Sequence, residues 1–294
     1  MNTLTHAHLP HHQGLGIDLG GTKLLIVSGE HTFHTSTGPG FGPEHLMQHL
    51  EAVCADWSLQ PAAIGLAVPG LVDANGGVAE CDVLPAFRQW PARQALQARW
   101  GDQVAVAVLN DVKAALAEEF ADAPADFTGV LVMAGTAIGS GLRVDGRVLR
   151  GTDGWAGELG YWPVQQPGGG WLRLDELAGG AFMAARRGVS PAELARLAEA
   201  GDPATRAVID AGATVLGAAL AGLVNLLNPS VVAVGGGALQ LAGYWPRVRE
   251  TLYRHALPLL GERCTLRQVT AGASVVALGA LRTAHAGSVF LLKP

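Results

Sequence analysis

The fold class of this chain is decided near its start by the stretch GLGIDLGGTK, residues 14–23. Its apolar first half predicts a buried strand, and the D-x-G-G sequence that follows predicts a tight turn into a second strand. Glycines in such a turn let backbone N–H groups approach an anion closely, and the Thr22 hydroxyl adds a donor. An ordinary β-hairpin explains the same residues, so this stretch alone leaves both interpretations open.

Around this stretch, strand and helix patterns alternate, and the order of elements then begins again. The first part has strand patterns at 14–18, 24–27, 31–35, 64–68 and 104–109, with helix patterns at 43–57, 91–100 and 112–120. The second has strand patterns at 130–134, 140–144, 147–150, 231–234 and 265–269, with helix patterns at 175–187, 191–200, 203–227, 244–255 and 274–285. The sequence therefore predicts an α/β protein with two domains, residues 1–120 and 121–294, and a ligand cleft between them.

The composition is that of a globular protein, with 49% hydrophobic and 15% charged residues among 294. The net charge is −5 and no Lys/Arg cluster occurs, so nucleic acid is not an expected partner. Three scattered cysteines cannot build a disulfide framework or a C-x-x-C metal site, which favours a reducing compartment. The first residues lack the apolar segment of a signal peptide, and a cytoplasmic location is expected.

An apolar stretch at 211–227 is at the short limit for a membrane-spanning helix. It is rich in Ala and Gly, contains Asn225, and ends at Asn228-Pro229 without basic flanks. We therefore predict a helix buried in a globular protein, with no membrane partner. The same helix is equally suited to packing against a second copy of the chain, so a homodimer stays open.

Two further glycine-rich turns follow predicted strands, GTAIGSG at 135–141 and Gly235-Gly236-Gly237. Neither is a Walker A loop, and neither fits the dinucleotide-binding fingerprint with its downstream acidic residue. Three such turns at strand ends of a repeated α/β plan favour a phosphate-rich ligand. Asp18, at the end of the first strand, is placed to hold the water shell of Mg²⁺ beside phosphate oxygens.

In this order and spacing, the motifs resemble those of the ROK family of sugar kinases and related repressors, within the actin-like, hexokinase-type ATPase fold. The resemblance runs from Gly16 to about Ala284. It rests on DLGGTK (18–23), GLAVPGLVD (65–73), LND (109–111), GTAIGSG (135–141), RGTDGWAGELG (150–160), NLLNPSVVAVGGG (225–237) and ASVVALGAL (273–281). It implies two actin-like (ribonuclease H-like) α/β domains with an interdomain cleft, the final helix being able to pack back on the first domain.

The resemblance also implies a sugar site. Asp111 would be the catalytic base and Asn110 would bind a neighbouring hydroxyl, although Asn-Asp at a helix start is also ordinary N-cap chemistry. Glu158 would bind sugar hydroxyls, with a solvated surface carboxylate as its alternative, and Gly70 would line the pocket. Asp175 matches a further sugar-binding carboxylate, with a helix N-cap as an equally supported alternative.

For the nucleotide, the resemblance implies ATP with Mg²⁺. The residues implied to hold the phosphates are Asp18, Gly20, Gly21, Thr22, Lys23, Gly135, Thr136 and Gly139, and those implied to lie near the nucleoside are Gly235, Gly236 and Gly237.

The sequence departs from the family pattern at its zinc site. Tyr161 stands where the family usually has a zinc-binding His that also touches the sugar, and PGGGWLRL (167–174) replaces the C-x-C-G-x-x-G-C run. We therefore expect no structural zinc. Tyr161 either donates a hydrogen bond to the sugar or fills space. Val83 replaces a common Asn, and Ala137 replaces a glycine of the second phosphate turn.

The expected activity is ATP-dependent phosphorylation of a hexose, first of all glucose at its 6-hydroxyl, by direct in-line transfer. The alternatives are a catalytically weak sugar-binding sensor, a kinase for an N-acetylhexosamine, and a kinase that uses polyphosphate. A repressor of the same family is not expected, because only about fifteen residues precede the first predicted strand. The expected partners are thus a small sugar and ATP.

Overall fold

A computed structural model of the protein describes residues 14–286 and groups them into two compact units. Unit 1 contains residues 14–121, 151–155 and 271–286, and unit 2 contains residues 122–150 and 156–270. The segments 151–155 and 271–286 thus belong with unit 1 although they follow residue 121 in the chain. The expectation that the first residues form no signal peptide concerns positions outside the described residues.

Unit 1 is built on a five-stranded sheet with the order β3-β2-β1-β4-β7. Its strands are β1 (Gly14–Leu19), β2 (Lys23–Ser28), β3 (His31–Ser36), β4 (Ala63–Val68) and β7 (Ala105–Asn110). β1, β4 and β7 run parallel, with Asp18 paired to Ala67 and Val68 paired to Asn110. The carboxyl ends of these three strands therefore meet at one edge of the sheet.

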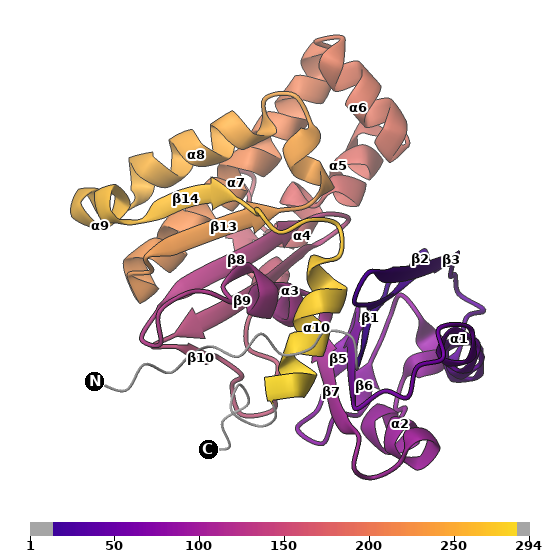
Figure 1. The fold of residues 1–294 in the computed structure, drawn as a ribbon. Coiled ribbons are helices and arrows are strands. Elements are labelled where there is room, and N and C mark those ends of the chain that lie inside the picture. Colours follow the sequence, from indigo (N-terminus) through magenta and orange to yellow (C-terminus); the bar gives the residue numbers. More distant parts are fainter. Residues whose placement is uncertain (1–13, 287–294) are drawn as a thin grey trace. The chain divides into compact units, whose positions relative to one another are not determined.

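Helices cover both faces of this sheet (Figure 1). They are α1 (Pro43–Asp56) and α2 (Ala92–Trp100) on one face, and α3 (Asp111–Glu119) and α10 (Val275–Ala286) on the other. α10 lies directly on the strand backbone, since a Cβ at Gly65 would overlap the backbone of Ala280. The Arg282 guanidinium on α10 makes an ion pair of 2.8 Å with Glu118 on α3. Two short strands, β5 (Leu71–Val72) and β6 (Val78–Glu80), and the 3-10 helix η2 (Pro85–Phe87) were not expected from the sequence.

Unit 2 repeats the same sheet plan with the order β10-β9-β8-β13-β14. Its strands are β8 (Gly129–Ala134), β9 (Ile138–Val144), β10 (Arg147–Val148), β13 (Val231–Gly235) and β14 (Thr265–Gln268). β8, β13 and β14 run parallel, while β9 and β10 are antiparallel to their neighbours. The α/β fold class and the topological repeat predicted from the sequence are confirmed.

The helices of unit 2 are α4 (Leu174–Ala178), α5 (Gly180–Arg187), α6 (Pro191–Glu199), α7 (Pro203–Leu227), α8 (Tyr244–His255) and α9 (Pro258–Arg263), with the 3-10 helices η3 (Leu159–Tyr161) and η4 (Gly237–Gln240). α7 is the one helix within residues 14–286 that is long and apolar enough to cross a membrane. Its apolar window of 18 residues has a mean hydropathy of 1.9. Half of that apolar window is buried in the unit, and Leu216 and Leu220 are fully enclosed. α7 packs along α8, as expected of a core helix.

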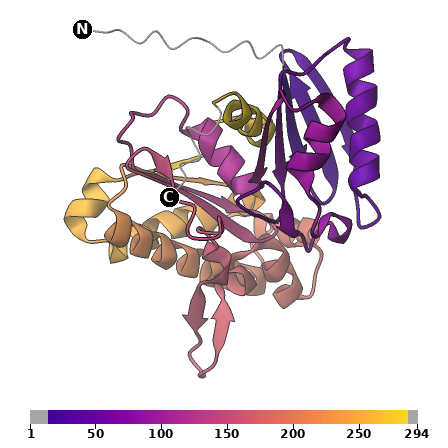
Figure 2. The ribbon, with the colours of Figure 1, turned by 90° about the horizontal axis from the view of Figure 1, so that it is seen from below.

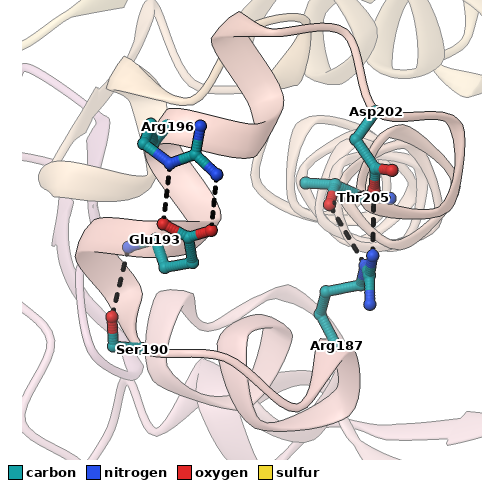
Figure 3. A network of polar contacts seen from close by, with 6 residues as sticks. All are labelled: Arg187, Ser190, Glu193, Arg196, Asp202 and Thr205. Atoms are coloured by element: carbon teal, nitrogen blue, oxygen red, sulfur yellow. Dashed lines mark hydrogen bonds and ion pairs between the residues drawn. The ribbon is translucent and has the colours of Figure 1, made fainter.

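The single helix expected at 175–187 is wrong, because the chain breaks at Gly179 between α4 and α5. Gly179 has extended backbone angles, and the next residue turns its N–H to the Gly135 carbonyl instead of into a helix. Polar contacts cap the helices that follow, and one of these contacts joins α5 to α7 (Figure 3). The Ser190 hydroxyl caps α6 by accepting from Glu193 N, and Asp202 caps α7 and pairs with Arg187 at 3.2 Å.

The segment after Tyr161 forms a two-stranded hairpin that projects from unit 2 (Figure 2). It consists of β11 (Pro163–Gln165) and β12 (Trp171–Arg173), with Gln165 opposite Trp171. Trp171 is 64% exposed. No strands were expected here from the sequence, because each is only three residues long.

Candidate functional site

Four of the expected site residues gather at the carboxyl edge of the sheet in unit 1. Asp18 is the last residue but one of β1, Gly70 follows β4, Asn110 ends β7, and Asp111 begins α3. The register places β4 between the other two strands, so the Asp18 and Asn110 backbones lie two strands apart. The parallel topology therefore brings Asp18 and Asp111, which are 93 positions apart in the sequence, to the same edge of the sheet.

Asn110 is an N-cap and also makes a second contact. Its side-chain oxygen accepts a hydrogen bond from Val112 N at 3.0 Å, as N-cap chemistry predicts. Its Nδ2 donates to the Gly70 carbonyl at 3.2 Å. The neighbouring Asp111 Oδ1 accepts from Val112 N at 2.8 Å. Capping therefore accounts for the Asn110 side-chain oxygen, while its Nδ2 group holds the turn that follows β4.

Gly70 has no room for a side chain. A Cβ at this position would overlap the Glu80 carbonyl oxygen, because β6 passes directly behind the turn. The close approach of two backbones explains the glycine without any ligand. It also leaves the Gly70 carbonyl in reach of Asn110.

The first glycine turn is tied down from the end of β3. Gly20 N donates to the Lys23 carbonyl at 2.8 Å, which closes the turn between β1 and β2. The Thr37 hydroxyl donates to the Gly20 carbonyl at 2.6 Å, and Thr37 N donates to the Thr22 carbonyl at 3.0 Å. Thr22 and Lys23 themselves are exposed. Thr37 was not predicted from the sequence, because nothing in its local pattern sets it apart from other threonines.

Asp18 is the ionisable group most affected by this arrangement. Burial raises the pKa of its carboxyl to about 6, and the nearby Lys23 ammonium acts in the opposite direction. An ionised Asp18 thus carries a negative charge that the surrounding residues offset only in part. A carboxylate of this kind beside an exposed glycine turn fits a divalent cation held together with phosphate oxygens.

The second and third glycine turns lie side by side in unit 2, at the carboxyl ends of β8 and β13. These strands pair up to Gly235, which lies opposite Met133. Gly236 has a φ of 99°, and a Cβ there would overlap the backbone of Ala134. Thr136 is exposed at the tip of the second turn, and Gly180 N donates to the Gly135 carbonyl at 2.8 Å. The pair Gly179-Gly180 was a usable sequence signal that the prediction of one continuous helix passed over.

Glu158 directly precedes the short helix η3, and Tyr161 is the last residue of that helix. Glu158 is exposed, as a solvated surface carboxylate would be, and its carbonyl accepts from Tyr161 N at 3.1 Å. Tyr161 is 58% exposed, and the Arg173 guanidinium lies 4.8 Å from the centre of its ring. The Tyr161 ring therefore stacks on a cation and does not fill the interior of the unit.

The N-cap interpretation of Asp175 is wrong, because that position belongs to Arg173, whose N–H donates to Glu176 Oε2. Asp175 lies one residue inside α4 and is 8% exposed. Its Oδ1 accepts from Ile138 N at 2.5 Å. Burial raises the pKa of the Asp175 carboxyl, while the Ile138 N–H and the Arg173 charge oppose that shift.

Within residues 14–286, no three His, Cys, Asp or Glu side chains converge as a metal site would require. Residues 167–173 form most of the tip and the second strand of the β11–β12 hairpin, and Leu174 begins α4. The expectation that no structural zinc binds here stays a prediction.

Comparison with known proteins places the chain in a family. The family model of the ROK family matches residues 14–286. A bifunctional enzyme NanE/NanK from Brucella melitensis is 31% identical over 257 residues, which cover 82% of this chain and 48% of that protein. The chain thus spans about half the length of this curated relative and of its counterpart from Brucella suis.

Other relatives match over most of their length. A glucokinase from Halalkalibacterium halodurans is 28% identical, with 74% of each chain covered. An N-acetyl-D-glucosamine kinase from Citrobacter koseri is 26% identical, with 83% of this chain and 90% of the relative covered. The crystal structure of a ROK hexokinase from Thermus thermophilus is 30% identical and has a TM-score of 0.76, covering 93% of this chain and 98% of that one. The chain therefore belongs to the ROK family and has its fold of two actin-like α/β domains.

Proposed function

We propose that the protein transfers the γ-phosphoryl group of ATP to a hydroxyl of a hexose, first of all the 6-hydroxyl of glucose. The observation that carries this proposal is the gathering of Asn110 and Asp111 at the same sheet edge as Asp18 and the first glycine turn. A base, an amide and a partly buried carboxylate beside an anion-binding turn are the parts that phosphoryl transfer needs. The proposal is supported by membership of the ROK family and by two kinds of kinase relative, a glucokinase and an N-acetyl-D-glucosamine kinase.

In this proposal, Asp111 accepts the proton of the attacking hydroxyl as the hydroxyl oxygen attacks phosphorus in line with the leaving ADP oxygen. Asn110 binds a neighbouring hydroxyl, held in orientation by its contacts with Gly70 and Val112. Gly70, Glu158 and Tyr161 are the further proposed sugar contacts. Their variety (a backbone turn, a carboxylate and a phenol) suits a polyhydroxylated ring.

The proposed nucleotide contacts come from all three glycine turns. Gly20 to Lys23, with Gly135, Thr136 and Gly139, are the proposed phosphate contacts, Thr22 and Thr136 through their hydroxyls, and Gly235 to Gly237 are proposed to lie near the nucleoside. Asp18 would hold Mg²⁺ through its water shell. When bound, Mg²⁺ supplies neutralisation of the charge on the phosphate oxygens.

The rival substrate class is an N-acetylhexosamine, which the relative from Citrobacter koseri acts on by its name. The residues around Asn110 do not distinguish a 2-hydroxyl from a 2-acetamido group, because both offer hydrogen-bonding partners. Two further rivals are a kinase that takes its phosphoryl group from polyphosphate and a sugar sensor with weak catalysis. Each of these functions predicts a different set of results in one assay.

The test is phosphate transfer by the purified protein with Mg²⁺, using ATP or polyphosphate against a panel of hexoses and N-acetylhexosamines. Asp111→Asn should lower kcat by about 10²- to 10⁴-fold with the best sugar, because the base is lost while the shape is kept. Asp102→Asn, an exposed carboxylate of the same unit, serves as the control and should keep wild-type turnover. Sugar binding without turnover on any donor would replace the kinase by the sensor. Full turnover by Asp111→Asn would overturn the base assignment.

A further inference from the structure

The carboxylate of Asp175 fixes the exit of the second glycine turn. Its Oδ1 accepts from Ile138 N, and Ile138 is the first residue of β9, directly after the exposed Thr136 and Ala137. A hydrogen bond between an ionised carboxylate and a backbone N–H is stronger than one between neutral groups. The bond is also shielded from water, because Asp175 is 8% exposed.

The entry of the same turn is held by the next residues of the same segment. Gly180 N donates to the Gly135 carbonyl at 2.8 Å, and Ala181 N donates to the Thr136 carbonyl at 3.3 Å. The break between α4 and α5 makes these N–H groups available at the start of α5. The segment that begins at Asp175 therefore makes hydrogen bonds to the second glycine turn at both its entry and its exit.

The loop that carries Glu158 rests on the same carboxylate. A Cβ at Gly160 would collide with Asp175 Oδ1 and would come within 2.5 Å of the Ile138 carbonyl oxygen. The other end of the loop is held to β9 by the Ser140 hydroxyl, which donates to the Gly157 carbonyl at 2.7 Å. Glu158 thus lies between two anchor points, one of which is the group that holds the second turn.

We infer that Asp175 is a positioning residue, which locks the second glycine turn and the Glu158 loop to each other so that the phosphate and sugar contacts of unit 2 are set together. The roles of the two segments rest on the proposed function, whereas the lock itself is a property of the backbone. A direct sugar contact, which the family resemblance implies for this carboxylate, predicts a different pattern of effects.

The lock is tested first by amide hydrogen exchange, which needs no activity. Asp175→Ala removes the acceptor and should speed exchange about tenfold or more at both 135–141 and 157–160, since opening then costs one strong hydrogen bond less. Asp175→Asn retains an oxygen acceptor and should stay within about threefold of wild type. Faster exchange at Ile138 alone, with 157–160 unchanged, would overturn the lock.

The functional consequence is tested by ligand affinity. In Asp175→Ala we expect the Kd for MgADP, measured by calorimetry in the absence of sugar, to rise about tenfold. The KM values for ATP and for the best sugar should each rise by about the same factor. Asp175→Glu separates the two explanations even where the Ala variant fails to fold. Its extra methylene presses on Gly160 and should weaken MgADP binding, whereas a sugar ligand would tolerate the longer carboxylate.

Asp202→Ala is the matched control, because Asp202 also accepts from a backbone N–H in unit 2, at the start of α7 (Figure 3). It should lower stability without changing MgADP affinity or exchange at 135–141. A raised KM for the sugar alone, with MgADP binding unchanged in Asp175→Ala and Asp175→Glu, would show a sugar ligand and overturn the inference. Absence of turnover and of MgADP binding in the wild type would instead defeat the proposed function, and the exchange measurement would still decide the lock.

Discussion

The Asn110 side chain links two strand ends, donating from Nδ2 to the Gly70 carbonyl at 3.2 Å while its oxygen caps α3. Asn110→Asp keeps the capping oxygen but turns an acceptor towards the Gly70 carbonyl, so the two oxygens repel each other. We expect a KM for the sugar raised about tenfold or more with a small change in stability. Steady-state kinetics and urea unfolding measure the two effects.

The control for this prediction is Ser190→Ala, which removes the cap of α6 in unit 2. It should cost about 0.5–2 kcal/mol of unfolding free energy and leave the KM unchanged. Asn110→Ala should cost no more than that in capping, because Asp111 Oδ1 also accepts from Val112 N. If Asn110→Asp lost stability as Ser190→Ala does but kept its sugar KM, Asn110 would be a cap only.

Gly21 in the first glycine turn faces Val83, and a Cβ at residue 21 would overlap the end of that side chain. Its φ is not in the left-handed region, so space and not backbone strain limits substitution. We expect Gly21→Ala to raise the KM for ATP by about ten- to a hundredfold through displacement of the turn. Val83, which is 52% exposed, should tolerate Ala with little effect.

The double variant Gly21→Ala/Val83→Ala tests the cause, since it removes the methyl group that the new Cβ meets. Its KM for ATP should return to within about threefold of wild type, because additivity fails for residues in contact. A double variant as impaired as Gly21→Ala would mean that the glycine is needed for close approach of the ligand to the backbone.

The strands and helices of both units were predictable because their apolar periodicity is long and regular. The bounds of α7 and α8 agree with the sequence prediction at both ends, and most others agree within one or two residues. The hairpin β11–β12 and the break at Gly179 were not predicted. The break at Gly179 comes with a hydrogen bond from Gly180 N to the distant Gly135 carbonyl, which no local pattern records. The strands of the hairpin are only three residues long, which is too short for a periodic pattern.

Within the candidate site, the sequence located the glycine turns and the Asn110-Asp111 pair but not their supports. Thr37 and Ser140 are ordinary polar residues until the fold brings their hydroxyls to the carbonyls of Gly20 and Gly157. Asp175 was identified as important through family resemblance, and its backbone partner Ile138 lies 37 positions away. Tertiary hydrogen bonds of this range are set by topology, which motif spacing alone does not provide.

The Tyr244 side chain holds the C-terminal end of α4 in place. Its hydroxyl donates to the Ala178 carbonyl at 2.8 Å, just before the break at Gly179, and its ring is fully buried. Tyr244→Phe leaves that buried carbonyl without its donor and should cost about 1–3 kcal/mol in unfolding free energy. Tyr253→Phe on the same helix, where the ring is 44% exposed, should stay within about 0.5 kcal/mol of wild type in urea unfolding. Equal effects of the two changes would mean that the Tyr244 hydroxyl bond is energetically negligible.

Asp175 and Asp202 should respond to pH in opposite directions. Burial raises the pKa of the Asp175 carboxyl in the folded protein, with the Glu176 charge adding to the shift and Ile138 N–H and Arg173 opposing it. A carboxyl group whose pKa is raised by folding stabilises the folded state fully at pH values below its unfolded-state pKa of about 4. This contribution is lost as the pH rises through the folded-state pKa. Asp175→Asn cannot ionise, so its unfolding free energy relative to wild type should improve as pH rises from 4 to 8.

For Asp202, hydrogen bonds from the Thr205 hydroxyl and N–H lower the pKa of the carboxyl. Its contribution is present above the unfolded-state value and is lost as pH falls through the folded-state value, so Asp202→Asn should lose ground relative to wild type as pH rises. Urea unfolding of both variants across this pH range measures the two slopes. Slopes of the same sign would mean that the hydrogen bond from Ile138 N–H outweighs burial at Asp175. The pKa of Asp175 would then be lowered by folding, as that of Asp202 is.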